Sequence, residues 1–228
     1  MTEIVLMSDP RVAAVPVQEC GERLTDLRRN GHLLVGERKW QDSGGAFAYL
    51  REGVLDRLLE AQAQLPHGVR FLFVEGYRPP SLQRHYFDTY AAQLSAQHPE
   101  WSAEQVRSAA SRYVSPPEIA PHSAGAAVDL TLADDDGGEL DMGTRMNATP
   151  EESAGACYTQ AGTISGKARF HRDILGAALV AVGLVNYPTE WWHWSYGDRY
   201  WGLATGAGAA VYGPKELDQP QMSNPHQK

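Results

Sequence analysis

The sequence predicts one globular domain that contains both α-helices and β-strands. Apolar residues recur at helical spacing within residues 46–65 and again within residues 167–182. A continuous β-prone run at residues 69–75 and an alternating run at residues 126–132 have the length and composition of strands. The chain has 228 residues, which is enough for one domain with a real core, and it shows no internal repeat or interdomain linker.

The N-terminal part is expected to pass from loops into a helix and then a strand. Residues 11–40 lack helical periodicity, so we expect them to be extended and loop-like, with only short strands or turns. The helix of residues 46–65 should end at Pro66, which is followed by a histidine and a glycine. The strand of residues 69–75 comes next and should be buried, because it is apolar and β-prone.

Two further helices are predicted after this strand. Pro79 and Pro80 indicate the start of a helix over about residues 82–96, because proline is tolerated in the first turn. A second helix over about residues 103–113 follows Ser102, whose hydroxyl suits the N-cap position.

The middle of the chain should contain a rigid segment, a strand and a tight turn. Prolines between residues 114 and 121 exclude a regular helix or a central strand, so this segment should deliver His122 in a restrained conformation. After the strand of residues 126–132, a turn is predicted at residues 134–138, with residues 139–142 returning. A calcium loop is the alternative there, but the later ligand positions of an EF-hand pattern are missing.

The C-terminal part should contain a long loop, a helix and short strands. Residues 143–166 are irregular and rich in small residues, and loops of this length in compact domains are usually functional. The helix of residues 167–182 should stop at Gly183, followed by a short return strand. Residues 190–196 are aromatic and strand-prone.

Composition narrows the classes of function. The formal net charge is −8, so a wide nucleic-acid-binding face is not expected, because such a face needs clustered basic residues. The two cysteines, Cys20 and Cys157, have no CxxC spacing and imply neither a disulfide framework nor a thiolate metal site.

The N-terminus does not have the pattern of a signal peptide. The N-terminus lacks the basic region and the long apolar core of a signal peptide, and no run approaches the roughly 18 apolar residues of a membrane span. We therefore expect a cytoplasmic protein with no membrane or nucleic-acid partner. Residues 1–228 should form a single domain, in which the polar segment 213–228 is a partly ordered tail.

Two stretches of the sequence carry residues that could form a metal site. His122 and Asp129 lie in one, and Glu190 and His193 lie in the other. Two imidazoles and one carboxylate could bind zinc, and a second carboxylate could act as a base, which is the set a zinc hydrolase needs. His122 and Asp129 are seven residues apart, so one regular strand would place them on opposite faces, but Gly125 would allow the chain to bend between them.

The spacing of residues also matters in the second stretch, which contains Glu190 and His193. Glu190 and His193 are three residues apart and would diverge in an ideal strand, but they could converge in a turn. His193 would then be the third ligand and Glu190 the general base. Arg78 follows the strand of residues 69–75 on a proline-stiffened turn and could stabilise an oxyanion; a structural ion pair is the alternative.

Most of the other residues that could carry chemistry have a simpler interpretation. The remaining histidines are more often core or surface groups than ligands, and the aromatic residues beside His193 could simply pack in the core, as we expect of at least one. The histidines are His32, His67, His85, His98, His171 and His226, and the aromatic residues are Trp191, Trp192 and Trp194.

These motifs resemble those of the VanX-type D-alanyl-D-alanine dipeptidases. That family belongs to a zinc peptidase superfamily that includes D-Ala-D-Ala carboxypeptidases and the hedgehog signalling domain. The spacing of His122, Gly125, Ala127 and Asp129, followed by Glu190 and His193, is similar to the family signature. Further similar segments are residues 74–79, 129–132, 141–144 and 212–214.

The resemblance implies a fold and a role for each residue. It implies an α+β fold in which helices flank a small, largely antiparallel sheet, with zinc in a cleft. His122, Asp129 and His193 would bind Zn2+, Glu190 would be the general base, and Arg78 would stabilise the transition state. The substrate would be a small dipeptide, D-Ala-D-Ala or a related D-amino-acid dipeptide.

The chain departs from the family pattern at two positions. Ala120 stands where the family usually has serine, and Asn147 stands where it has an aspartate that helps hold the substrate ammonium. The protein would then bind the substrate ammonium more weakly, bind it through Glu151 or Glu152 instead, or act on substrates that have no free ammonium. Two alternatives therefore stay open: the same zinc chemistry on a modified or N-blocked dipeptide, and a non-catalytic zinc-binding module.

Overall fold

The computed structural model describes residues 4–29, 31–36, 42 and 44–217. Its centre is a five-stranded sheet with strand order β2-β4-β5-β7-β6. Strands β2 and β4 are parallel, and every other neighbouring pair is antiparallel. The predicted largely antiparallel sheet is thus confirmed. The strands are β2 (Leu34–Val35), β4 (Arg70–Glu75), β5 (Ala127–Ala133), β6 (Val185–Asn186) and β7 (His193–Ser195).

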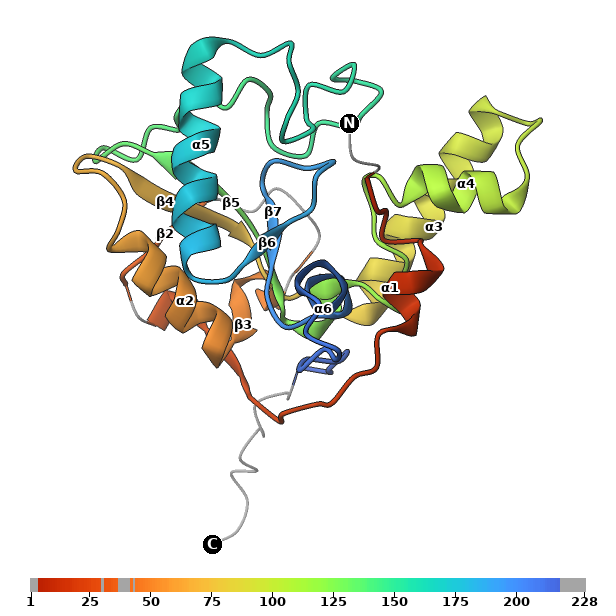
Figure 1. The fold of residues 1–228 in the computed structure, drawn as a ribbon, viewed down its shortest axis with the longest axis horizontal. Coiled ribbons are helices and arrows are strands. Elements are labelled where there is room, and N and C mark those ends of the chain that lie inside the picture. The colour runs from red at the N-terminus through yellow and green to blue at the C-terminus, as the bar shows by residue number, and fades with distance from the viewer. Residues whose placement is uncertain (1–3, 30, 37–41, 43, 218–228) are drawn as a thin grey trace, which may run out of the picture.

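Helices lie on both sides of this sheet (Figure 1). Helices α2 (Glu52–Gln62) and α5 (Gly166–Ala181) pack against each other, and α5 also contacts β5. Helices α3 (Pro80–Gln97) and α4 (Ala103–Ala110) form a helical hairpin on the opposite side in Figure 1. The main core lies between the sheet and α2 and α5, and strand β5, which is buried along its whole length, crosses it.

The predicted helix of residues 46–65 is wrong in its first third. Residues Ala46–Ala48 form a 3₁₀ turn, Tyr49–Arg51 form strand β3, and α2 begins only at Glu52. Strand β3 pairs with β1 (Leu24–Asp26) in a separate two-stranded sheet. Apolar side chains at 47 and 50 fit helical spacing, but the pairing with a strand about 25 residues earlier overrides it.

Other boundaries differ from the prediction by a few residues. Residues Pro10–Ala14 form the short helix α1, where the sequence predicts a loop. Asp9 caps this helix by accepting a hydrogen bond from the Arg11 amide. Asp9 and Pro10 are typical helix-start residues, so the signal was present in the sequence. The N-cap role of Ser102 is confirmed, and it forms a full capping box with Gln105. Helix α4 ends at Ala110 rather than at residue 113.

The end of the chain is held close to the predicted site residues as far as the structure describes it. Helix α6 (Arg199–Thr205) packs on α1, and the Lys215 amide donates to the Ser123 carbonyl. Residues 213–217 are therefore hydrogen-bonded to the body of the protein, whereas the rest of the predicted tail, including His226, lies outside the described residues. Within the described ranges, no helix is long and apolar enough to cross a membrane.

Candidate active site

His122 lies on a 3₁₀ turn immediately before strand β5. This turn (Pro121–Ala124) ends at Gly125, whose left-handed conformation (φ 65°) turns the chain into the strand. The bend predicted at Gly125 is therefore present. The Nδ1 of His122 lies 2.6 Å from the Gly76 carbonyl oxygen. Because a carbonyl can only accept, Nδ1 donates to it, and Nε2 is the ring nitrogen that faces the site and is available to a ligand.

Asp129 and His193 are directly opposite each other in the antiparallel pair β5–β7, so their side chains share one face of the sheet. The distance from His193 Nδ1 to Asp129 Oδ1 is 3.0 Å. His122 Nε2 lies 3.2 Å from His193 Nδ1 and 3.4 Å from Asp129 Oδ1. Three potential ligand atoms thus form a nearly equilateral triangle, and all three residues are buried.

The size of this triangle fits a metal ion. Ligands about 2.0–2.1 Å from a tetrahedral zinc ion are separated from one another by roughly 3.3 Å. The two imidazole nitrogens lie 3.2 Å apart, and each also lies within 3.4 Å of the same Asp129 oxygen, so all three atoms could contact one cation. Burial would raise the pKa of Asp129, but the charges and hydrogen bonds of the two histidines hold it well below its usual range.

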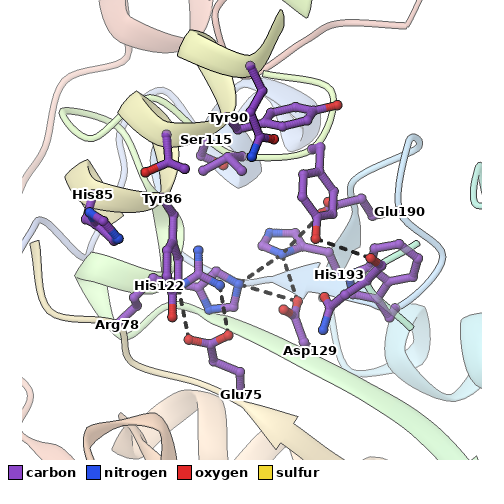
Figure 2. Close-up of a pocket in the computed structure, with 16 residues that line it drawn as sticks. Glu75, Arg78, His85, Tyr86, Tyr90, Ser115, His122, Asp129, Glu190 and His193 are labelled. Atoms are coloured by element: carbon purple, nitrogen blue, oxygen red, sulfur yellow. Dashed lines mark hydrogen bonds and ion pairs between the residues drawn. The ribbon is translucent and has the colours of Figure 1, made fainter. Parts of the chain in front are cut away.

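Glu190 faces the same triangle from the turn that precedes β7 (Figure 2). The His193 amide donates to the Glu190 carbonyl, so residues 190–193 form the turn on which convergence of the two side chains depended. The Asn186 carboxamide donates to the backbone carbonyl oxygens of Glu190 and His193, each at 3.0 Å, and thereby holds the turn. A Glu190 carboxylate oxygen lies 3.9 Å from His193 Nδ1. Burial, reinforced by the charge of Asp129, raises the pKa of Glu190 well above its usual range.

Arg78 is both an ion-pair partner and a pocket residue. Its Nε and Nη2 donate to the two carboxylate oxygens of Glu75 at 2.9 and 2.8 Å, and its Nη1 donates to Gln83 Oε1 at 2.9 Å. These bonds use three of the five guanidinium N–H groups, which leaves one on each Nη. Arg78 therefore does form a structural ion pair, which was the alternative interpretation. Its two remaining N–H groups are still available to a ligand.

These residues line one pocket of about 300 Å³. Its opposite wall is one face of α3, and Figure 2 shows His85, Tyr86 and Tyr90 of that helix above the histidine and carboxylate cluster. No motif in the sequence indicated this wall, and His85 was expected only as a surface or core group. The aromatic and polar residues on one side of the predicted helix were a signal for this wall. Nothing in their pattern indicated which part of the protein that side of the helix would contact.

The long loop of residues 143–166 contributes less to the pocket than expected. Of this loop, within the part of the chain that the structure describes, only Asn147 lines the pocket. Glu151 bonds Arg112 and Tyr90, and Glu152 bonds Arg145. Neither glutamate lines the pocket, so the expectation that one of them could hold a substrate ammonium is not met by this structure.

The aromatic residues beside His193 are core residues, as expected of at least one of them. Trp191, Trp192 and Trp194 are all buried, and Trp192 also lines the pocket. His171 follows the simple interpretation too, since its Nδ1 lies 2.7 Å from the Asp141 carbonyl oxygen.

A buried His-Asp-His cluster in a pocket, beside a glutamate and an arginine, defines a site of the metallopeptidase class. The chain belongs to the M15 peptidase family, described as D-ala-D-ala dipeptidase, whose family model matches residues 45–205. The protein is therefore a metallopeptidase by family.

Individual relatives agree with this membership. A D-alanyl-D-alanine dipeptidase of Synechocystis sp. is 28% identical over 218 residues, which cover 82% of this chain and 87% of the relative. A D-alanyl-D-alanine dipeptidase of Escherichia coli K12 is 36% identical over 72 residues, 32% of this chain and 35% of the relative.

Solved structures show more distant likeness. A vancomycin-resistance D,D-pentapeptidase VanY in complex with Zn(II) is 18% identical, with a TM-score of 0.39 over 77% of this chain and 88% of VanY. The LD-carboxypeptidase LdcB is also 18% identical, with a TM-score of 0.40 over 77% of this chain and 72% of LdcB.

Proposed function

We propose that this protein is a zinc-dependent dipeptidase that hydrolyses D-Ala-D-Ala or a related D-amino-acid dipeptide. The observation that carries this proposal is the triangle of ligand atoms, with edges of 3.0, 3.2 and 3.4 Å, at the bottom of a pocket that also contains Glu190 and Arg78. The substrate class follows from the family and from the names of the two curated relatives.

The three ligands would be His122 through Nε2, Asp129 through a carboxylate oxygen, and His193 through Nδ1. Three protein ligands leave a fourth tetrahedral position open, as catalytic zinc sites do. A zinc ion bound there would supply Lewis acidity, which polarises a carbonyl and lowers the pKa of water. The hydrogen bond from His122 Nδ1 to the Gly76 carbonyl fixes the orientation of the imidazole.

Glu190 would accept the proton of the attacking water and deliver it to the departing amine. Its carboxylate is buried beside the triangle, 3.9 Å from His193 Nδ1, so it could reach a water held at the fourth position of an ion bound there. The unused N–H groups of Arg78 would donate to the oxyanion of the tetrahedral intermediate. Glu75 and Gln83 hold the guanidinium for this role before the substrate arrives.

The volume of the pocket favours a small substrate. About 300 Å³ is at the lower end of small-molecule sites, and one helix face closes the side opposite the ligands. A dipeptide or its simple derivative suits this space better than a long chain threaded through it.

The decisive test of this function is Glu190→Gln. The variant should still bind one zinc ion per chain, because no proposed ligand changes, but should lose at least about 100-fold in kcat, because the amide cannot accept a proton. Metal content can be measured by mass spectrometry, and alanine release from the four stereoisomers of Ala-Ala by chiral chromatography.

Glu139→Gln is the matched control for this test, since Glu139 is exposed and lies outside the pocket. It should keep full turnover. Unchanged kcat in Glu190→Gln would refute the role of this residue. Stoichiometric zinc with no hydrolysis of any dipeptide by the unmodified protein would instead favour a non-catalytic zinc module.

A further inference from the structure

The acidic residues of the pocket are all engaged close to the candidate metal site. The carboxylates that line the pocket in the described part of the chain belong to Glu75, Asp129 and Glu190. Glu75 accepts two hydrogen bonds from Arg78, Asp129 contacts both histidines, and Glu190 is the proposed base. With a divalent metal, the charges of these carboxylates, Arg78 and the metal cancel, so the pocket has no surplus negative charge for a cation.

The wall opposite the ligands offers ring surface and neutral polar groups. Tyr90 and Tyr113 pack edge to face with ring centroids 5.1 Å apart. The Tyr90 hydroxyl donates to Glu151, and the Tyr113 hydroxyl donates to the backbone carbonyl of Asn147. Their hydroxyls are thus already bonded within the protein, and ring surface is what they mainly present to a ligand.

Asn147 lies in this pocket in an unusual backbone conformation. Its φ of 59° is left-handed, a region that asparagine adopts more readily than most residues. Its carbonyl oxygen accepts hydrogen bonds from Tyr113 at 3.2 Å and from Arg145 at 3.4 Å, so the backbone is held at this point. Among the described residues, the hydrogen bonds of Asn147 are those to its backbone carbonyl, which leaves its side-chain carboxamide as a neutral donor and acceptor for a ligand.

Glu151 and Glu152 are the nearest additional carboxylates to Asn147. Neither could turn into the pocket to bind a cation without breaking its present contacts. Glu151 is bonded to both Arg112 and Tyr90, which ties the loop to the helix α3 side of the pocket. Glu152 pairs with Arg145 at 2.7 Å and accepts from the Thr149 amide. Both carboxylates therefore hold the shape of the loop that carries Asn147.

We propose that Asn147 is a specificity-determining residue that selects substrates with an uncharged, amide-bearing group at the amino end, such as N-acylated dipeptides. This inference rests on the proposed peptidase function and names its substrate class. A carboxamide can donate to an acyl carbonyl and accept from its N–H, whereas it cannot neutralise an ammonium ion. The tyrosine ring surface accommodates the apolar part of the acyl group.

The test compares substrates that differ only at the amino end. We expect kcat/KM of the unmodified enzyme for N-acetyl-D-Ala-D-Ala to exceed that for D-Ala-D-Ala at least 10-fold. Propionyl-D-Ala, which lacks the amino group altogether, should also be hydrolysed faster than D-Ala-D-Ala, because no ammonium has to be desolvated. Released D-alanine is the readout for all three.

Asn147→Asp tests the residue itself. Aspartate tolerates the left-handed conformation, so the fold should be kept, and its charge should shift the preference towards free D-Ala-D-Ala at least 10-fold. Gln97→Glu is the matched control, because it makes the same amide-to-acid change at an exposed residue of α3 that does not line the pocket. This control should leave the preference unchanged.

Binding of the same substrates to Glu190→Gln, measured by calorimetry, reads the preference independently of turnover. Tighter binding of free D-Ala-D-Ala than of its N-acetyl derivative by the Asn147-containing protein would overturn the proposal, as would equal shifts in Asn147→Asp and Gln97→Glu. Failure of the peptidase function has a different signature, which is binding of dipeptides without hydrolysis of any of them by the unmodified enzyme.

Discussion

At the scale of single residues, Arg78 shows why residue type matters more than charge. Its guanidinium serves Glu75 and Gln83 at the same time and still has N–H groups left over. Lysine has three donors on one nitrogen and cannot reproduce this planar fork. Arg78 stays charged, because the gain from Glu75 exceeds the cost of burial and raises its pKa.

Arg78→Lys should therefore lower kcat by roughly 10²–10³-fold while changing KM by less, because the lost donors act on the transition state. Steady-state kinetics on the best dipeptide substrate measures both constants. Arg107→Lys is a suitable control, since Arg107 forms an exposed ion pair with Glu118. An equal rise in KM with unchanged kcat would place Arg78 in ground-state binding instead.

The site residues differ in how visible they are from the sequence. His122, Asp129, Glu190 and His193 could be nominated by type and spacing, and the structure brings all four together. Asn186, which holds the turn between Glu190 and His193, carries no such signal, because an asparagine beside a short strand is common.

At the scale of elements, the turn at Gly125 decides whether His122 and Asp129 meet. A Cβ at this position would lie 2.2 Å from Leu24 Cδ2, in addition to the strain of a positive φ. The glycine therefore serves both the bend of the chain and the close approach of strand β1.

Gly125→Ala should destabilise the fold by about 2–4 kcal/mol, combining left-handed strain with overpacking. Gly137→Ala separates the two causes, because φ there is 84° but no atom lies within 4 Å of the added Cβ. That control should cost only about 1–2 kcal/mol. Urea denaturation measures both, and equal losses would show that the contact with Leu24 is unimportant.

At the scale of the whole molecule, metal binding should be coupled to stability. The triangle joins β5 and the turn immediately before it to β7, with Asp129 and His193 64 residues apart in the sequence, and it concentrates buried polar groups that a cation would satisfy. A ligand that binds only the folded state stabilises it by roughly 2.7 kcal/mol when present at about 100 times its Kd.

Removing the metal with a chelator should lower Tm by roughly 5–10 °C, given that each kcal/mol shifts Tm by about 2–4 °C in a domain of this size. Thermal unfolding followed by circular dichroism, with and without added zinc, measures the shift. Asp129→Asn should respond to neither chelator nor zinc. A Tm that is unaffected by complete removal of bound metal would argue against the proposed ligand set.

By itself, the sequence determined the presence of β4, α3, β5 and α5 and nominated the three residues that the structure brings together as a candidate metal site, because local periodicity and motif spacing are properties of neighbouring residues. Only the tertiary structure decided that β3 replaces the start of a helix, that one face of α3 closes the pocket, and that Asn147 alone reaches it from the loop of residues 143–166 within the described chain. The physical reason is that strand pairing and helix packing join segments tens of residues apart, and no local pattern records which distant surface a segment will meet.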